Sequence, residues 1–230
     1  MKKYEFTGET KQIELLSRTA TLHRIRAVVE FGFVKVGDLG GWIEKEENLS
    51  HVGKAWVCGD AKVCGDAKVW GNAKVCGDAK VWGNAKVWGN AKVCGDAEVC
   101  GDAKVCGDAE VWGNAKVCGD AKVWGNAKVW GNAKVWGNAK VCGDAEVCGD
   151  AEVFSVNHIL VIGPAGSRSD FTTFFRDKDN EITVKCGCFL GKIDKFLEKV
   201  SRTHGDNKHA LVYRAAVEVA KLQIELTERK

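Results

Sequence analysis

The sequence predicts a protein of the β class: a parallel β-helix with a β cap before it and a small α+β domain after it. One six-residue unit, Ala-(Lys/Glu)-Val-(Cys/Trp)-Gly-(Asp/Asn), repeats over residues 55–153 without a change of phase, apart from Trp56 at its second position. Such a fixed short period determines the architecture before any other signal is read. The flanking residues 1–48 and 155–230 do not repeat, which divides the chain into three parts.

Residues 1–48 are expected to form an N-terminal cap. Residues 22–28 alternate apolar and polar side chains, and residues 36–43 are rich in turn-forming Gly and Asp. The open end of a β-helix exposes unpaired strand edges, which invite end-to-end association unless another element covers them. We therefore assign residues 1–48 to that cover.

Residues 49–154 are expected to form the β-helix. Side chains alternate along a strand, so Ala and Val of each unit point inward while Lys or Glu and Cys or Trp point outward. Gly followed by Asp or Asn suits a corner, because these residues accept positive φ or bond their own backbone. Three strands and three corners give a coil of 18 residues. Residues 49–154 then make about six coils, a prism roughly 28 Å long, whose stacked coils share one core.

Residues 155–230 are expected to form a small α+β domain. Residues 158–162 suggest a buried strand, and residues 171–176 and 181–186 flank a polar turn, which predicts a hairpin. Two helices follow, the second capped by Asp206 or Asn207. Their expected inward faces are Ile193, Phe196, Leu197 and Val200 in the first helix and Leu211, Ala215, Val219 and Leu222 in the second.

Composition and charge exclude several classes of protein. The 230 residues carry 34 Lys and Arg against 31 Asp and Glu, a net charge of +3, which gives no overall attraction to nucleic acid. No apolar run approaches the ~18 residues of a membrane span, and the first residues lack the apolar core of a signal peptide. We expect a cytoplasmic protein without membrane contact, in which cysteines are reduced.

Two features carry a resemblance to known proteins. An aliphatic residue with a small residue two positions earlier, at every unit, resembles the hexapeptide-repeat superfamily, which implies a left-handed parallel β-helix. Residues 34–43, which contain Gly37-Asp38-Leu39-Gly40-Gly41-Trp42-Ile43, resemble uncharacterised hexapeptide-repeat proteins of bacteria and their prophages. Residues 186–189 and 203–208 resemble a domain of phage-type relatives. This resemblance implies a bacterial host and a phage or prophage setting, but no activity.

The better-known hexapeptide-repeat proteins are acyltransferases that use acyl-CoA, generally as trimers with a His of the β-helix as general base. Here the five His, at positions 23, 51, 158, 204 and 209, all lie outside the regular units, and no long loop leaves a coil. A His outside the prism can still serve as a base, so acyltransferase stays the alternative. We expect no enzyme, no catalytic residue and no cofactor.

The irregular C-terminal part offers a candidate ligand site. Residues 163–168 follow an expected strand but lack the Lys-Ser/Thr of a P-loop. They are either a plain glycine turn or a small anion site that uses backbone N–H groups. The candidate ligand-binding residues are Ser167, Arg168, Thr172, Thr173 and Arg176. The spacing Cys186-x-Cys188 is too close for a standard zinc pair, so we expect no metal site.

The outward columns of the prism offer a second candidate surface. Residues 18 apart stack on one side, and one such column holds only Lys: Lys68, Lys86, Lys104, Lys122 and Lys140. Two positions further on, the same side carries Trp70, Trp88 and Trp124 with Cys between them. This face either attracts an anionic partner, packs against another subunit, or is merely solvated.

The cysteines also stack at 18-residue spacing, as Cys58, Cys76 and Cys94 in one column and Cys100 and Cys118 in another. Adjacent coils place their Cα atoms within disulfide range, although free thiols are expected in a reducing cytosol and metal binding is a further alternative. All nine Cys units continue Gly-Asp and all seven Trp units continue Gly-Asn, which indicates two duplicated cassettes.

These observations favour a non-enzymatic binding or scaffold protein of phage or prophage type. It would bind a small anionic, nucleotide-like ligand or a host protein through the C-terminal domain. It would also associate with itself, as a dimer or trimer, through a prism face or the C-terminal domain. A purely structural, oligomerising β-helix is the further alternative.

Overall fold

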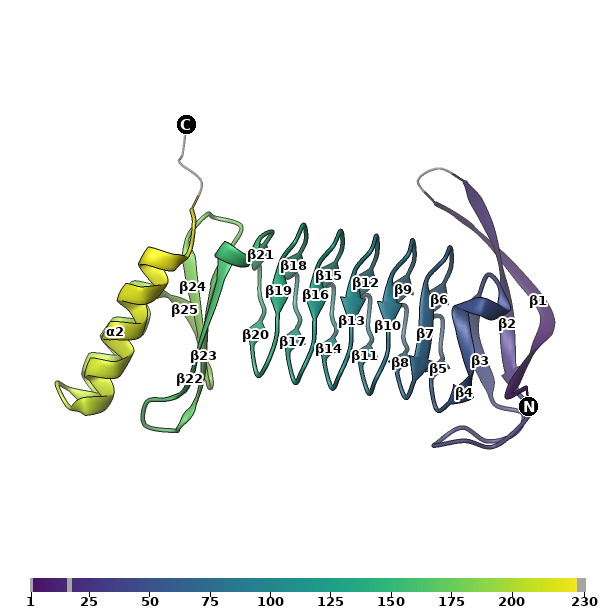
Figure 1. Ribbon diagram of the computed structural model, residues 1–230, viewed down its shortest axis with the longest axis horizontal. Helices are drawn as coiled ribbons and strands as arrows, with labels where there is room; N and C mark the ends of the chain where they lie inside the picture. Colours follow the sequence, from purple (N-terminus) through teal and green to yellow (C-terminus); the bar gives the residue numbers. More distant parts are fainter. Residues whose placement is uncertain (1, 16–17, 227–230) are drawn as a thin grey trace.

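The computed structural model describes residues 2–15 and 18–226. A prism of stacked coils forms the middle of the molecule, with a β cap at one end and an α+β domain at the other (Figure 1). The prism is a parallel β-solenoid of about six coils, as the repeat predicts.

Three parallel sheets form the sides of the prism. The first face consists of β6 (Lys62–Val63), β9 (Lys80–Val81), β12 (Glu98–Val99), β15 (Lys116–Val117), β18 (Lys134–Val135) and β21 (Glu152–Val153). The Lys face consists of β4 (Leu49–Gly53), β7 (Lys68–Gly71), β10 (Lys86–Val87), β13 (Lys104–Val105), β16 (Lys122–Val123) and β19 (Lys140–Val141). The third face consists of β5 (Trp56–Val57), β8 (Lys74–Val75), β11 (Lys92–Val93), β14 (Glu110–Val111), β17 (Lys128–Val129) and β20 (Glu146–Val147).

Each strand pairs with strands 18 residues away, so equivalent residues stack. Val105, for example, lies between Val87 and Val123. The Ala and Val of the repeat fill the interior at 0 to 1% exposure, which gives one continuous core along the prism. The corners stack as well: Asn72 Nδ2 donates to Asn90 Oδ1 at 3.0 Å, and Asn90 Nδ2 donates to Asp108 Oδ1 at 2.9 Å.

The N-terminal cap extends the first face instead of merely covering it. Strands β1 (Tyr4–Glu14), β2 (Thr19–Ala27) and β3 (Leu39–Ile43) are antiparallel to one another, and β3 pairs in parallel with β6. The result is one nine-stranded sheet. The buried side chains of Tyr4 and Trp56 close the end of the core, and the Tyr4 hydroxyl donates to the Leu49 carbonyl at 2.9 Å.

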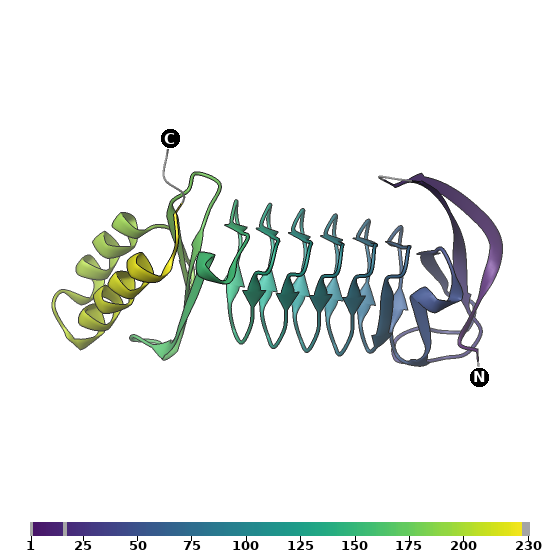
Figure 2. The same cartoon turned by 45° about the horizontal axis from the view of Figure 1, so that its top comes forward.

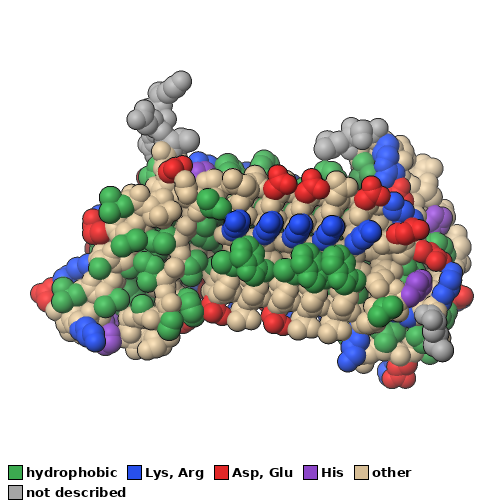
Figure 3. Space-filling view, viewed as in Figure 1, with side chains coloured by type: hydrophobic (Ala, Val, Ile, Leu, Met, Phe, Trp, Pro, Cys, Tyr) green, Lys and Arg blue, Asp and Glu red, His purple; other side chains and the backbone are tan. Residues whose placement is uncertain are grey.

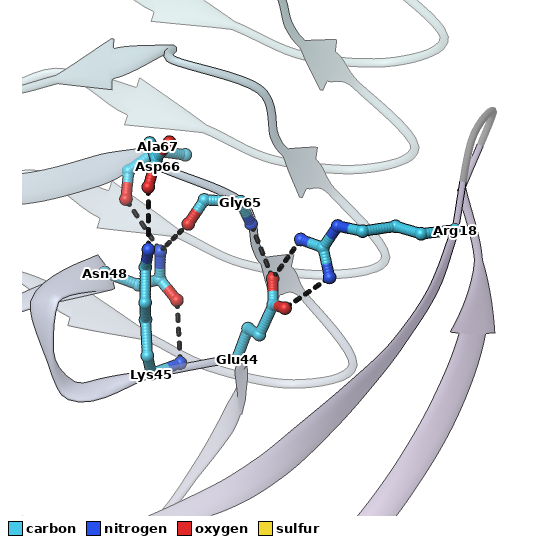
Figure 4. A network of polar contacts seen from close by, with 7 residues as sticks. All are labelled: Arg18, Glu44, Lys45, Asn48, Gly65, Asp66 and Ala67. Atoms are coloured by element: carbon cyan, nitrogen blue, oxygen red, sulfur yellow. Dashed lines mark hydrogen bonds and ion pairs between the residues drawn. The ribbon is translucent and has the colours of Figure 1, made fainter.

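Polar contacts join the cap to the first coil beside the short 3₁₀ helix η1 (Glu46–Asn48) (Figure 4). Asn48 Nδ2 donates to the Ala67 and Gly65 carbonyls at 2.8 and 3.0 Å. The Glu44 carboxylate accepts from the Gly65 N–H at 2.7 Å and from Arg18 Nη2 at 2.7 Å. These contacts lower the pKa of Glu44 because they favour its charged form, the Arg18 hydrogen bond most of all.

The C-terminal domain is a four-stranded antiparallel sheet between the last coil and two helices (Figures 1 and 2). After η2 (Val156–His158) it comprises β22 (Ile159–Ala165), β23 (Asp170–Arg176), β24 (Ile182–Cys186), β25 (Phe189–Lys192), α1 (Ile193–His204) and α2 (Lys208–Gln223). Phe175 packs into the prism core, whereas its neighbour Phe174 packs against Phe196 of α1. The sheet therefore covers the open end of the prism with one face and carries the helices on the other.

Two details of this domain differ from the sequence prediction. A fourth strand, β25, follows the predicted hairpin. The predicted inward face of the second helix is wrong: Leu211, Val219 and Leu222 are 59%, 47% and 89% exposed, and Ala215 is exposed as well. The helix instead buries Ala210, Tyr213, Ala216, Val217 and Ala220, because this face meets Phe174 of the sheet and Phe196 of α1 in one apolar cluster, with the Tyr213 ring packed edge-on against Phe196. Asn207 caps α2, as predicted, and accepts from the Ala210 N–H at 3.2 Å.

The stacked cysteines also differ in part from expectation. A disulfide joins Cys100 and Cys118 on adjacent coils, with Cα atoms 4.6 Å apart, so free thiols were the wrong expectation for this pair. Cys58, Cys76 and Cys94 are free.

Candidate anion-binding site

A cavity of about 140 Å³ lies in the C-terminal domain, between the loop after β22, the turn after β24, and the two helices. Three of its side chains are basic: Arg168, Lys199 and His204. The others are Ser167, Cys186, Cys188, Phe189, Phe196, Val200, Thr203 and Tyr213. Among the residues that the structure describes, no Asp or Glu belongs to this lining, so the cavity is suited to an anion.

Two glycines allow the loops to close around the cavity. Gly166 has a φ of +72°, and a Cβ on it would overlap the hydroxyl group of Tyr213. Gly187 has a φ of +54°, and a Cβ there would lie 2.5 Å from Nη1 of Arg168. Both positions favour glycine for their positive φ, and at Gly166 the Tyr213 ring also leaves no space for a Cβ. The turn at Gly166 places Ser167 and Arg168 at the rim of the cavity, and the turn at Gly187 lies beside Arg168.

Hydrogen-bonding groups surround the basic side chains. Ser167 Oγ lies 3.5 Å from Nε2 of His204, at the end of α1. Burial, together with the neighbouring Cys186, raises the pKa of Tyr213, so its hydroxyl keeps its proton near neutral pH. Arg168 offers a planar fork of N–H donors that matches phosphate or carboxylate oxygens.

The five predicted ligand-binding residues do not form one site. Ser167 and Arg168 line the cavity, and Thr172 lies behind it, donating from Oγ1 to Cys186 Sγ at 3.2 Å. Thr173 and Arg176 instead lie where the sheet meets the prism. Thr173 Oγ1 accepts from the Glu146 N–H at 3.0 Å.

Arg176 is 7% exposed, lies 4.9 Å from the Phe154 ring centroid, and has Nη2 3.8 Å from a Glu152 oxygen. Its contacts hold the C-terminal domain on the last coil, as do those of Thr173.

Sequence reasoning missed Lys199, His204 and Tyr213. They reach the cavity from α1 and α2, and only the packing of both helices on the sheet places them beside Ser167. One sequence feature could have indicated Lys199, namely the amphipathic pattern of α1. This pattern puts Lys199 and Thr203 next to the buried Phe196 and Val200.

The Lys face of the prism is a second basic surface. Its five Lys side chains form a row along the prism, with hydrophobic side chains beside them (Figure 3). Within the described residues none of these five Lys forms an ion pair, whereas the other two faces pair Lys with Glu. On the first face, Lys116 Nζ lies 3.2 Å from Glu98 Oε2. On the third face, Lys92 Nζ lies 2.7 Å from Glu110 Oε1.

The five His side chains lie at the two ends of the molecule. His51 stacks on Tyr4 in the cap with ring centroids 4.3 Å apart, and burial lowers the pKa of His51. His204 lines the cavity of the C-terminal domain, with the His209 ring centroid 5.8 Å from its own. His51 belongs to β4 at the capped end of the prism, and the regular repeat units of residues 55–153 contain no His.

No protein-family model matches this chain, and a search of curated proteins finds no match. The predicted relationship to bacterial and prophage hexapeptide-repeat proteins therefore stays a prediction. Over the part of the chain that the structure describes, no helix combines the length and apolar character needed to cross a bilayer.

Proposed function

We propose that this protein is a non-enzymatic binding scaffold that takes a small anion in the cavity of its C-terminal domain. The observation that carries the proposal is a lining with Arg168, Lys199 and His204 and, over the described part of the chain, no carboxylate. The prism acts as a rigid support, and its last coil holds the sheet on which the cavity is built.

The size of the cavity defines the part of a ligand that it can hold. Small-molecule sites generally measure about 300–1,000 Å³, whereas this cavity measures about 140 Å³. One phosphate or carboxylate group fits that volume, so a nucleotide-like ligand would enter by its phosphate end. In a phage or prophage setting such binding would sequester a small anionic molecule of the bacterial cytoplasm.

Self-association is part of the proposal. Leu211, Val219 and Leu222 form an exposed apolar row on α2, and such rows favour contact with another protein surface. A dimer or trimer through this helix would leave the cavity on the other side of α1 and α2 accessible.

The experiment is calorimetric titration of the purified protein with inorganic phosphate, comparing Arg168→Ala with Arg202→Ala. Both residues are exposed, but only Arg168 lines the cavity. We expect Arg168→Ala to weaken binding about tenfold and Arg202→Ala to leave it unchanged. Equal effects would refute the cavity as the site, and loss of binding only on mutation of the Lys face would place it on the prism.

A titration with acetyl-CoA tests the alternative of acyltransferase activity. A non-enzymatic scaffold is expected to show no acetyl transfer. Saturable binding at micromolar concentration, with turnover that a His204→Ala change abolishes, would overturn the proposal.

A further inference from the structure

The Lys face carries a column of aromatic side chains that is interrupted once. Along β7, β10, β13, β16 and β19 the outward residues are Trp70, Trp88, Cys106, Trp124 and Cys142. Trp70 and Trp88 stack with ring centroids 5.0 Å apart and planes inclined by 1°. Cys106, on the next coil, leaves the following position of that stack without a ring.

This interruption has the dimensions of one planar ring. Strands β10, β13 and β16 pair in register, so Trp88 and Trp124 are two strand spacings apart, roughly 10 Å. A ring inserted midway would have its centroid about 5 Å from each indole, within the range of stacked aromatic pairs. In Figure 3 the hydrophobic side chains beside the Lys row fall into two separate groups.

The other faces do not offer this arrangement in the described residues. On the third face Trp112 and Trp130 occupy adjacent coils and stack on each other at 5.0 Å. On the first face the two positions between Trp82 and Trp136 are occupied by the disulfide of Cys100 and Cys118. These two Trp are therefore three strand spacings apart, which is too far for one ring to contact both.

Positive charge accompanies the interruption. Lys86, Lys104 and Lys122 lie on the same three strands, two residues before Trp88, Cys106 and Trp124, and point outward with them. Lys86, Lys104, Lys122 and Lys140 also line a groove of about 420 Å³ on the side away from the Trp column, together with the corner residues Asn84, Asp102, Asp120 and Asn138. No ion pair joins these carboxylates to the row among the described residues. On the Trp side the corner carboxylate beside the interruption is Asp108, which accepts from Asn90 Nδ2 at 2.9 Å.

We infer that this interruption is a nucleotide-binding site, in which Trp88 and Trp124 sandwich the base over Cys106 and the Lys row holds the phosphates. Stacking on aromatic side chains needs only a planar π-face and therefore suits any base. The ammonium groups supply point charges for the phosphate chain. The site lies on the prism, is separate from the cavity of the C-terminal domain, and does not depend on the function proposed for that cavity.

The test fills the interruption with the protein's own alternative cassette. The double change Cys106→Trp and Asp108→Asn completes the column between Trp88 and Trp124 and reproduces a unit that occurs seven times in the chain. The matched control, Cys142→Trp with Asp144→Asn, adds the same cassette beyond Trp124 and leaves the gap open. Calorimetric titrations use ATP, inorganic triphosphate and an adenylate oligonucleotide.

We expect wild type and the Cys142 control to bind ATP alike and more tightly than triphosphate. The Cys106 variant should bind ATP about 5- to 150-fold more weakly, the range that stacking of one base contributes. Lys104→Ala should weaken both ATP and triphosphate. Equal binding of ATP by the Cys106 variant and the wild type, or equal binding of ATP and triphosphate by the wild type, would overturn the site. Tighter binding of the oligonucleotide would overturn a free nucleotide as its ligand.

Discussion

Replacing Gly89 with alanine tests how closely the coils of the prism approach one another. Gly89 lies at a corner with a φ of +73°, and a Cβ there would lie 2.9 Å from both N and O of Gly107 on the next coil. Gly143 occupies the equivalent corner of a later coil with a φ of +64°, but no atom of the described residues lies within 4 Å of the same Cβ position. The two glycines share backbone conformation and differ in the presence of a following coil.

The two substitutions therefore separate two costs. A left-handed conformation costs a non-glycine residue about 1–2 kcal/mol, and this cost applies to both Gly89→Ala and Gly143→Ala. Forcing an extra methyl group into close-packed structure costs about 1–3 kcal/mol more, and this cost applies to Gly89 alone. We expect a loss in the free energy of unfolding of about 2–5 kcal/mol for Gly89→Ala, and of about 1–2 kcal/mol for Gly143→Ala.

Equilibrium urea unfolding, followed by circular dichroism, measures both losses in the same buffer. Amide hydrogen exchange then shows whether the Gly89 variant opens around its own corner, where the coil spacing must widen. Equal losses for the two variants would refute the reasoning, because they would show that coil contact adds nothing to the requirement for glycine.

Three other predictions concern the prism and its junctions. Deleting residues 79–96 removes one coil and keeps every inward column in phase, so a soluble protein with unchanged ellipticity per residue is expected, and an unfolded product would argue against an 18-residue coil. Reducing the Cys100–Cys118 disulfide, which closes an 18-residue loop, should lower the free energy of unfolding by about 3 kcal/mol; a Cys100→Ser variant that still responds to reductant would contradict this. Burial of Asp177 opposes its ionisation, but hydrogen bonds from Lys192 and Thr183 outweigh burial and hold its pKa below 3.8. That stabilisation is present above pH 3.8 and disappears as the pH falls through the lowered pKa. Asp177→Asn should thus lose about 1.5–3 kcal/mol at pH 7 and much less at pH 2, and a pH-independent loss would count against the ion pair.

The prism could be predicted from sequence because its structure is local and repeated. Each six-residue unit contains both the inward–outward alternation of one strand and the Gly-Asp or Gly-Asn of one corner. The 18-residue spacing between paired strands then follows from three equal sides. The second helix shows the limit of such reasoning. It has apolar residues on two faces, and only contact with the sheet decides that Tyr213 and Val217 are buried while Leu211 and Leu222 are exposed.

The candidate site could be predicted only in part for the same reason. Ser167 and Arg168 stand out because a glycine turn presents them to solvent, a property of adjacent residues. Lys199 and His204 join them through tertiary packing that leaves no local signature. Arg176 was assigned from its chemistry alone, and its partners Glu152 and Phe154 belong to the prism, on the other side of the sheet.

The threefold section of the prism turns a change in gene length into a rotation. One hexapeptide covers one side of the triangle, so its duplication advances the chain by a third of a strand spacing, about 1.6 Å, and turns everything after it by a third of a revolution. Only multiples of three units restore the azimuth of the C-terminal domain relative to the cap. Gain or loss of hexapeptide units thus rotates the C-terminal domain relative to the cap and shifts it along the prism axis at the same time. Selection on the mutual orientation of these two domains would favour length changes of 18 residues.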